Sequence, residues 1–200
     1  MVAPENNLLN ILASLLSYGL TLYMWVVIVR AVISWVNPNP HNPVVRFLAK
    51  VTDPVLYHVR RILPVSYSGI DFSPIILILL IIFFNDFAVR SLKAIALGMP
   101  SSVVLPFFVI SVIRLVQGVL FAFMIVIIAR AVISWISPDP YNPIVRFIYG
   151  VTEPLLSRLR RMLPLVVGGV DLTPIVVIAL IYFINMFLDR AMLHFGQAFI

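Results

Sequence analysis

Long stretches without a charged residue alternate along the chain with shorter stretches that are basic and rich in proline. The first charge-free stretch, 8–29, is long enough to cross a hydrocarbon core of about 30 Å as a helix. The only charge before it is acidic (Glu5), whereas a removable signal peptide begins with basic residues, so we expect this span to be retained. The pattern predicts four spans, at about 10–36, 74–93, 109–136 and 174–193.

The pattern repeats with an offset of 100 residues, so that residues 30–64 align with residues 130–164 without a gap. Matched pairs beyond this segment include Asp71 with Asp171, Asn85 with Asn185, and Arg90 with Arg190. The chain is therefore a tandem duplication. We expect a first repeat over 1–98 and a second over 99–200.

Between the two spans of each repeat lies a basic segment with apolar residues at helical spacing. Asn42 and Asp53 each stand before a proline, a favoured start of a helix. The segment therefore predicts interfacial helices over about 43–62 and 143–162, with a break at Pro54. Amphipathic helices of ten residues are too short to span and suit the membrane interface. The alternative is a solvated loop that packs against the bundle.

Composition supports a membrane protein, since 62% of the residues are hydrophobic and 11% are charged, against about 25% charged in soluble domains. The net charge is +6, and in so apolar a chain basic residues face anionic lipid headgroups, so we expect no direct nucleic-acid binding. The expected fold class is an all-α membrane protein. It has four transmembrane helices as two parallel tandem repeats, each built as span, interfacial amphipathic helices and span.

Charge asymmetry predicts the topology. Segments 37–73 and 137–173 hold four Lys or Arg each, and the positive-inside rule places both in the cytoplasm and both termini outside. The repeats are then related by a pseudo-two-fold axis along the membrane normal.

Two pairs of residues mark the cytoplasmic ends of the first and third spans. Trp35 and Trp135 are expected at the membrane interface, where aromatic belts lie. Arg30 and Arg130 lie deeper and are expected to snorkel toward headgroups. The alternative is that the two arginines form a paired intramembrane site.

Enzyme chemistry finds little support in the sequence. There is no cysteine, the three histidines lack a metal-ligand spacing, and the catalytic motifs of serine hydrolases, zinc proteases and phosphate loops are missing. Asp71 and Asp171 are the best carboxylate candidates, but each precedes Ser-Pro or Thr-Pro at the start of a span. A carboxylate is stabilised there as a helix cap. We expect a protein that is not an enzyme and has no cofactor or metal.

Polar residues within the spans mark candidate pathways, because ionisable groups are costly in hydrocarbon. The candidates are Asn85, Asp86, Arg90, Asn185, Asp189 and Arg190. Asp86 and Arg90 lie four residues apart and neutralise one another on one helix face. Asparagine in a span more often bonds helices together, so both a structural and a transport role stay open.

The repeated pattern NPxxRFxxxVTxPxLxxxRRxLP, followed by GxDxSP or GxDxTP, resembles the YggT family of small bacterial integral membrane proteins. The resemblance covers nearly the whole chain, twice, and extends to YlmG proteins and plastid relatives. It implies links to osmotic-shock tolerance, cation uptake and cell-division gene clusters, and no catalytic residues. The motif arginines are the candidate surface for anionic lipid or a partner: Arg46, Arg60, Arg61, Arg146, Arg160 and Arg161.

We therefore expect a non-enzymatic organiser or assembly factor of the bacterial inner membrane, linked to envelope, cell-division or osmotic-stress physiology. Its expected partners are anionic phospholipids, a membrane protein that the sequence does not identify, and further copies of itself. The alternative function is an oligomeric ion or osmolyte channel or transporter.

The topology is testable with a fluorescent reporter that matures only in the cytoplasm, fused after residue 200. Because the positive-inside rule places the C-terminus outside, cells that express the fusion should be dark. Bright cells would overturn the predicted orientation, and a fusion in loop 137–173 gives the cytoplasmic control.

Overall fold

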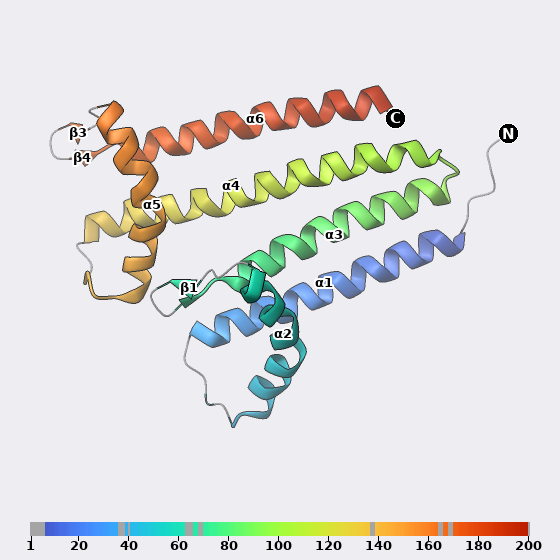
Figure 1. Ribbon diagram of the computed structural model, residues 1–200, viewed down its shortest axis with the longest axis horizontal. Helices are drawn as coiled ribbons and strands as arrows, with labels where there is room; N and C mark the ends of the chain where they lie inside the picture. Colours follow the sequence, from blue (N-terminus) through green and yellow to red (C-terminus); the bar gives the residue numbers. More distant parts are fainter. Residues whose placement is uncertain are drawn as a thin grey trace. The chain divides into compact units, whose positions relative to one another are not determined.

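The computed structural model describes residues 7–35, 39, 41–62, 66–67, 70–136, 139–163, 166–167 and 170–199. Its helices are α1 (Asn7–Trp35), α2 (Pro43–Ile62), α3 (Ser73–Ala96), the 3₁₀ turn η1 (Ser101–Val103), α4 (Val104–Ile136), α5 (Pro143–Met162) and α6 (Thr173–Phe199) (Figure 1). Four two-residue strands form two small sheets: β1 (Ser66–Tyr67) with β2 (Ile70–Asp71), and β3 (Val166–Val167) with β4 (Val170–Asp171). The side chains of Trp35 and Trp135, predicted at the interface, lie outside the described residues.

The helices α1, α3, α4 and α6 are long and apolar enough to cross a membrane. The chain is thus an all-α membrane protein with four transmembrane helices, as predicted. Each repeat contributes two of them, so both repeats enter the membrane in the same orientation.

The prediction of a break at Pro54 is wrong, because α2 is one helix of 20 residues with Pro54 inside it, and α5 likewise contains Pro154. Proline removes only its own N–H from the helical ladder, and neighbouring groups can compensate for the bonds lost near it. The Tyr23 hydroxyl of α1 also donates to the Val51 carbonyl (3.4 Å), which ties α2 to α1 just before Pro54. The buried face of α2, which includes Thr52, continues past the proline and holds the helix on the spans.

The internal contacts divide the chain into two compact units. Unit 1 comprises Met1–Ser66, Asp71–Leu115 and Met192–Ile200, and unit 2 comprises Tyr67–Ile70 and Val116–Ala191. The repeat boundary at residue 98 follows the duplicated sequence and not these contacts, and it stays a prediction.

The two units have the same core, at positions 100 residues apart. In unit 1 the core consists of Val27 from α1, Leu56 and Val59 from α2, and Leu77 and Ile81 from α3. In unit 2 it consists of Ile127 from α4, Leu156 from α5, and Val177 and Ile181 from α6. In each unit a crossing helix, α2 or α5, is therefore packed against both spans of its repeat.

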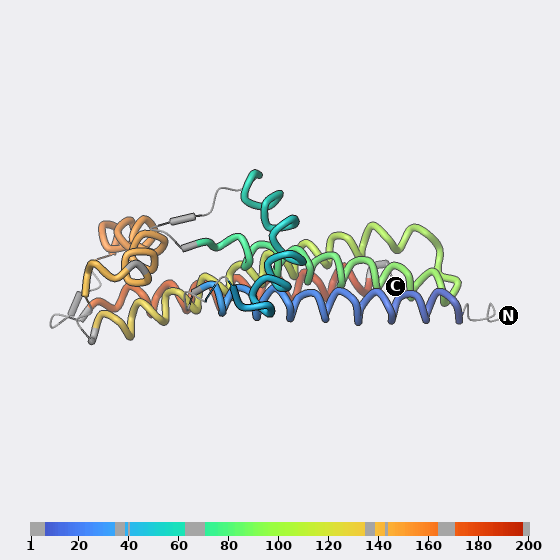
Figure 2. Tube along the Cα trace, turned by 90° about the horizontal axis from the view of Figure 1, so that it is seen from below, coloured from blue at the N-terminus to red at the C-terminus, as the bar shows by residue number. Residues whose placement is uncertain are grey.

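Each crossing helix lies toward the C-terminal end of the span that precedes it, away from the start of that span (Figures 1 and 2). From Asn7 to the packed Val27, α1 rises about 30 Å, and from Val104 to Ile127, α4 rises about 35 Å. A bilayer core is about 30 Å thick. The core residues under α2 and α5 thus lie at a depth that suits a membrane surface.

A tight turn joins α3 to the next span. Gly98 has a φ of 72°, and the N–H groups of Gly98 and Met99 donate to the carbonyls of Ile95 and Ala94 (both 3.0 Å). This is the Schellman arrangement that ends a helix on a left-handed glycine. It directs η1 and α4 back along α3, where Phe107 and Ile110 pack against Ala94.

Candidate functional site

The helix α2 presents three different faces. One face is buried on the spans through Leu48, Thr52, Leu56 and Val59. A second face is apolar yet exposed, and consists of Val44, Phe47, Val51, Val55 and Ile62. The third is cationic and exposed, and consists of Arg46, Lys50 and Arg61.

The helix α5 repeats this arrangement. Its buried face holds Val145, Ile148, Thr152 and Leu156, and its exposed apolar residues include Ile144, Val151, Leu155 and Met162. Arg146, Arg158 and Arg161 are exposed. In the described part of the chain, the guanidinium groups of Arg46, Arg61, Arg146 and Arg161 make no hydrogen bond or ion pair, so their charge is available to a ligand.

Arg60 differs from its neighbour Arg61, because it belongs to a first ion-pair cluster (Arg30, Asp53, Arg60, Asp71). The Arg60 Nε donates to Asp71 Oδ2 (2.8 Å), which ties the end of α2 to the segment before α3. Arg30 Nη2 of α1 lies 3.6 Å from Asp53 Oδ1 of α2. The first cluster therefore links α2 to both spans of its repeat.

Asp71 lies one residue before the N-cap position of α3, and its Oδ1 accepts the N–H of Ser73, the first residue of the helix (2.9 Å), so it stabilises the helix start as the sequence predicts. Asp171 does the same for Thr173 at the start of α6 (2.9 Å). Partial burial raises the pKa of Asp71, but the hydrogen bonds from Ser73 and the charge and hydrogen bonds of Arg60 outweigh it, so that the pKa is below its ordinary value. The carboxylate is thus held ionised, as a structural anion.

The second ion-pair cluster (Arg130, Glu153, Arg160, Asp171) occupies the matching place in unit 2 and is more tightly bonded. The side chain of Arg130 is only 8% exposed, and its Nη1 donates to Thr152 Oγ1 (2.7 Å). Its guanidinium also pairs with Glu153 and lies over the Tyr149 ring, 4.4 Å from the centroid. Arg160 Nη2 donates to the same Glu153 (3.0 Å).

These contacts correct the expectation that Arg130 snorkels. Its charge is buried and neutralised by a carboxylate on α5, because Thr152, Glu153 and Tyr149 supply partners at the same depth. They also explain why the acid before the motif proline differs between copies. Glu153 is one methylene longer than Asp53 and bridges two arginines.

A mid-span cluster lies in unit 1, away from α2. Asp86 accepts from Arg90 Nε (2.7 Å), the i,i+4 pair that the sequence predicts. It also accepts from Arg114 Nη1 (2.6 Å) and Ser111 Oγ (2.9 Å) of α4, which the sequence analysis missed. A signal was present: Asp86 and Arg114 are equally distant from Pro100 in the linker, so an antiparallel helix pair brings them to the same depth.

The remaining polar candidates are placed differently. In unit 2, Gln117 Nε2 donates to Asp189 Oδ1 (2.8 Å), with the backbone carbonyl of Asn185 3.5 Å away. Arg190 is exposed. Asn85 Oδ1 is buried and accepts no hydrogen bond in the described part of the chain. Among the described residues, no group of three or more His, Asp or Glu could hold a metal ion.

Comparison with known proteins agrees with this duplicated arrangement. The family model described as CCB3/YggT matches the chain twice, over residues 9–92 and 109–192. The chain belongs to the CCB3/YggT family. An uncharacterized protein of Haemophilus influenzae is 34% identical over 82% of this chain and 83% of its own length. The uncharacterized protein YggT of Escherichia coli is 29% identical over 89% of both chains. No solved structure matches.

Within this CCB3/YggT chain, the motif arginines divide into two groups. Arg60 and Arg160 lie in the two ion-pair clusters and hold the crossing helices in place. The four unpaired arginines (Arg46, Arg61, Arg146 and Arg161) lie on exposed positions of α2 and α5. Adjacent residues on a helix point about 100° apart, which explains why the twin arginines have different surroundings.

The two ion-pair clusters give a matched test of stability. Arg130→Gln should lower the free energy of unfolding by about 2 kcal/mol, since it removes hydrogen bonds of a buried charge. Arg30→Gln should cost less, because the Arg30 pair is longer and has no hydrogen bond. Unfolding in mixed detergent micelles measures both, with Arg158→Gln as the exposed control. A larger loss for Arg30→Gln would contradict the assignment.

The lowered pKa of Asp71 predicts a pH dependence of stability. The ionised group contributes stability that is full above about pH 4 and is lost as the pH falls through its lower folded-state pKa. Asp71→Asn should therefore destabilise the protein at pH 7 by about 1–2 kcal/mol, and the difference from wild type should shrink toward pH 3. Asp139→Asn, an exposed change outside the cluster, is the control. A difference that persists unchanged at pH 3 would show that the charge of Asp71 is not the cause.

Proposed function

We propose that this protein is a non-enzymatic organiser of the bacterial inner membrane, in which α2 and α5 lie on the cytoplasmic surface and bind anionic phospholipid headgroups. The observation that carries the proposal is the pairing of faces on each crossing helix. In each repeat an exposed apolar face lies on the same helix as two unpaired arginines, Arg46 and Arg61 on α2 or Arg146 and Arg161 on α5.

The depth of the crossing helices supports this placement. They pack on the spans about 30 Å from the far ends, so a bilayer that covers the spans would end at their level. The exposed apolar face of α2, which includes Phe47 (63% exposed), then reaches the acyl region of the bilayer, while Arg46 and Arg61 reach the headgroups. The excess of Lys and Arg in these two loops supports a cytoplasmic orientation.

We expect a role in organisation or assembly of the envelope during division or osmotic stress. Such a role fits a protein that binds lipid at two surfaces. Two equivalent surfaces on one molecule act together, so the affinity for a membrane patch exceeds that of one surface alone.

The alternative function, an ion conduit, finds less support in the mid-span cluster. The carboxylate of Asp86 is the natural ligand for a cation in the spans, but two arginines and Ser111 occupy its oxygens. The cluster therefore carries a net positive charge, which repels cations.

The twin arginines provide a matched test of lipid binding. Arg61→Gln with Arg161→Gln should lower the retention of phosphatidylglycerol and cardiolipin on the order of tenfold, because each basic residue near an anionic leaflet contributes to binding. Arg60→Gln with Arg160→Gln removes the same formal charge from paired positions, so it should reduce stability more than lipid retention.

The measurement is co-purified lipid at matched detergent and salt, from protein whose orientation has been checked with the reporter fusion. Equal lipid loss in both double variants, or no loss in either, would contradict the proposal and point to a role of the arginines in orientation alone.

A further inference from the structure

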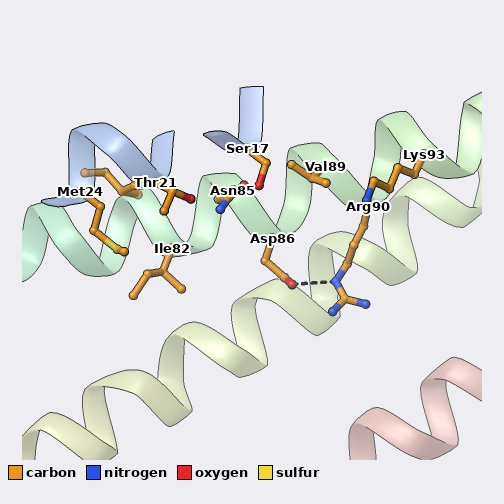
Figure 3. A pocket seen from close by; sticks show the side chains of 10 residues that line it. Ser17, Thr21, Met24, Ile82, Asn85, Asp86, Val89, Arg90 and Lys93 are labelled. Atoms are coloured by element: carbon orange, nitrogen blue, oxygen red, sulfur yellow. Dashed lines mark hydrogen bonds and ion pairs between the residues drawn. The ribbon is translucent and has the colours of Figure 1, made fainter. Parts of the chain in front are cut away.

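A groove lies between α1 and α3 in unit 1, with a volume of about 500 Å³, within the range of about 300–1,000 Å³ typical of small-molecule sites. Figure 3 shows that its two ends differ. Met24 and Ile82 lie at one end, and Arg90 and Lys93 lie at the other, with Asn85 between them. The groove is therefore amphipathic along its length.

The cationic end of the groove has more positive than negative side chains. Asp86 is the acidic residue of the lining, and it already accepts from Arg90, Arg114 and Ser111. Arg90 uses its Nε for this bond, and within the described residues its two terminal nitrogens and the Lys93 ammonium have no partner. Asp86 thus neutralises only one of the two arginines that bond to it, and Lys93 adds a further positive charge about one turn along α3. An unneutralised charge in a span is costly. A bound anion would remove that cost.

The second repeat shows that packing two such spans does not require this groove. Ser17 and Val89, which line it, correspond to Gln117 and Asp189, which hydrogen-bond to each other across α4 and α6 (2.8 Å). Lys93 corresponds to Leu193. The duplication kept the helices and changed these side chains, so the cationic groove is a property of the first repeat.

The position of the groove along α3 fits one orientation of an amphiphile. Lys93 lies about 5 Å from the end of α3 at Ala96, whereas Ile81 packs in the core beside α2. In a bilayer the cationic end therefore lies near the headgroups of the leaflet opposite α2, and the apolar end lies deeper. Asn85 lies between the two ends of the groove, where the ester groups of a lipid follow the phosphate, and its Nδ2 is a donor for their carbonyl oxygens.

We propose that this groove binds one anionic phospholipid of the leaflet opposite α2. Its phosphate lies on Arg90 and Lys93, its glycerol region lies at Asn85, and an acyl chain lies along Met24, Ile81 and Ile82. The site differs from the proposed surface of α2 and α5 in its helices and in its leaflet, so it stands whether or not that surface binds lipid.

Photo-crosslinking tests the site by position. The protein is reconstituted in phosphatidylcholine vesicles that contain a trace of phosphatidylglycerol with a photoreactive acyl chain, and crosslinked residues are mapped by mass spectrometry. Crosslinks are expected at Met24 and Ile82, at least several-fold above those from a photoreactive phosphatidylcholine, and inorganic phosphate should not compete.

Two variants separate charge from shape. Arg90→Gln with Lys93→Gln removes the cations, and Ser17→Gln with Val89→Asp installs the side chains of the second repeat. Each should reduce the groove crosslinks on the order of tenfold. Arg190→Gln and the Arg61→Gln with Arg161→Gln variant should leave them unchanged, and each protein is required to elute as one species by gel filtration. Equal crosslinking by both lipids, competition by phosphate, or unchanged crosslinks in the two groove variants would overturn the proposal.

Discussion

The packing of one face of a short crossing helix on both spans of its own repeat is the constraint on which the rest of the structure depends. The buried residues Leu48, Thr52 and Leu56 are spaced by four, and their counterparts on α5 are buried in the same way. Once that face points to the spans, helix geometry fixes where every other side chain lies. The exposed apolar residues come to one side of the buried face, and the unpaired arginines come to the side of the helix that points away from it. The position of each crossing helix on the spans of its repeat thus follows from its core contacts.

Ion pairs complete this attachment, and in the second repeat one of their members, Arg130, is buried. An arginine in a span is tolerated when a carboxylate meets it at the same depth, and α5 provides that group for Arg130. The cost of an unpaired charge makes the attachment specific, because a crossing helix shifted by one residue would leave Arg130 or Arg160 without its partner. The apolar face alone would allow such a shift, since neighbouring apolar residues could replace one another.

The sequence predicted the spans, the duplication and the extent of the crossing helices, because these depend on local periodicity and on an offset visible in one chain. Sequence-based prediction failed where contacts between residues far apart in the chain determine the structure. Pro54 predicts a break by its own chemistry, yet the core contacts of α2 carry the helix past it. Arg130 looks solvated from its neighbours in sequence, whereas its partners Thr152 and Glu153 lie over 20 residues away. The link between Asp86 and Arg114 required the antiparallel pairing of α3 and α4 to be taken into account.

Comparison of the two repeats also distinguishes the side chains that both copies share from those that differ between them. On the side of the crossing helices, core and ion-pair positions are occupied by the same or closely similar residues in both repeats. Toward the other ends of the spans, Asp86 corresponds to Met186 and Ser17 to Gln117, and the polar contacts differ. A surface built twice suits a ligand that is abundant and uniform, such as a charged leaflet. A site present once, such as the groove between α1 and α3, suits a ligand that binds as a single molecule. The two proposed lipid contacts, one in each leaflet, therefore fit the difference between the two ends of the spans.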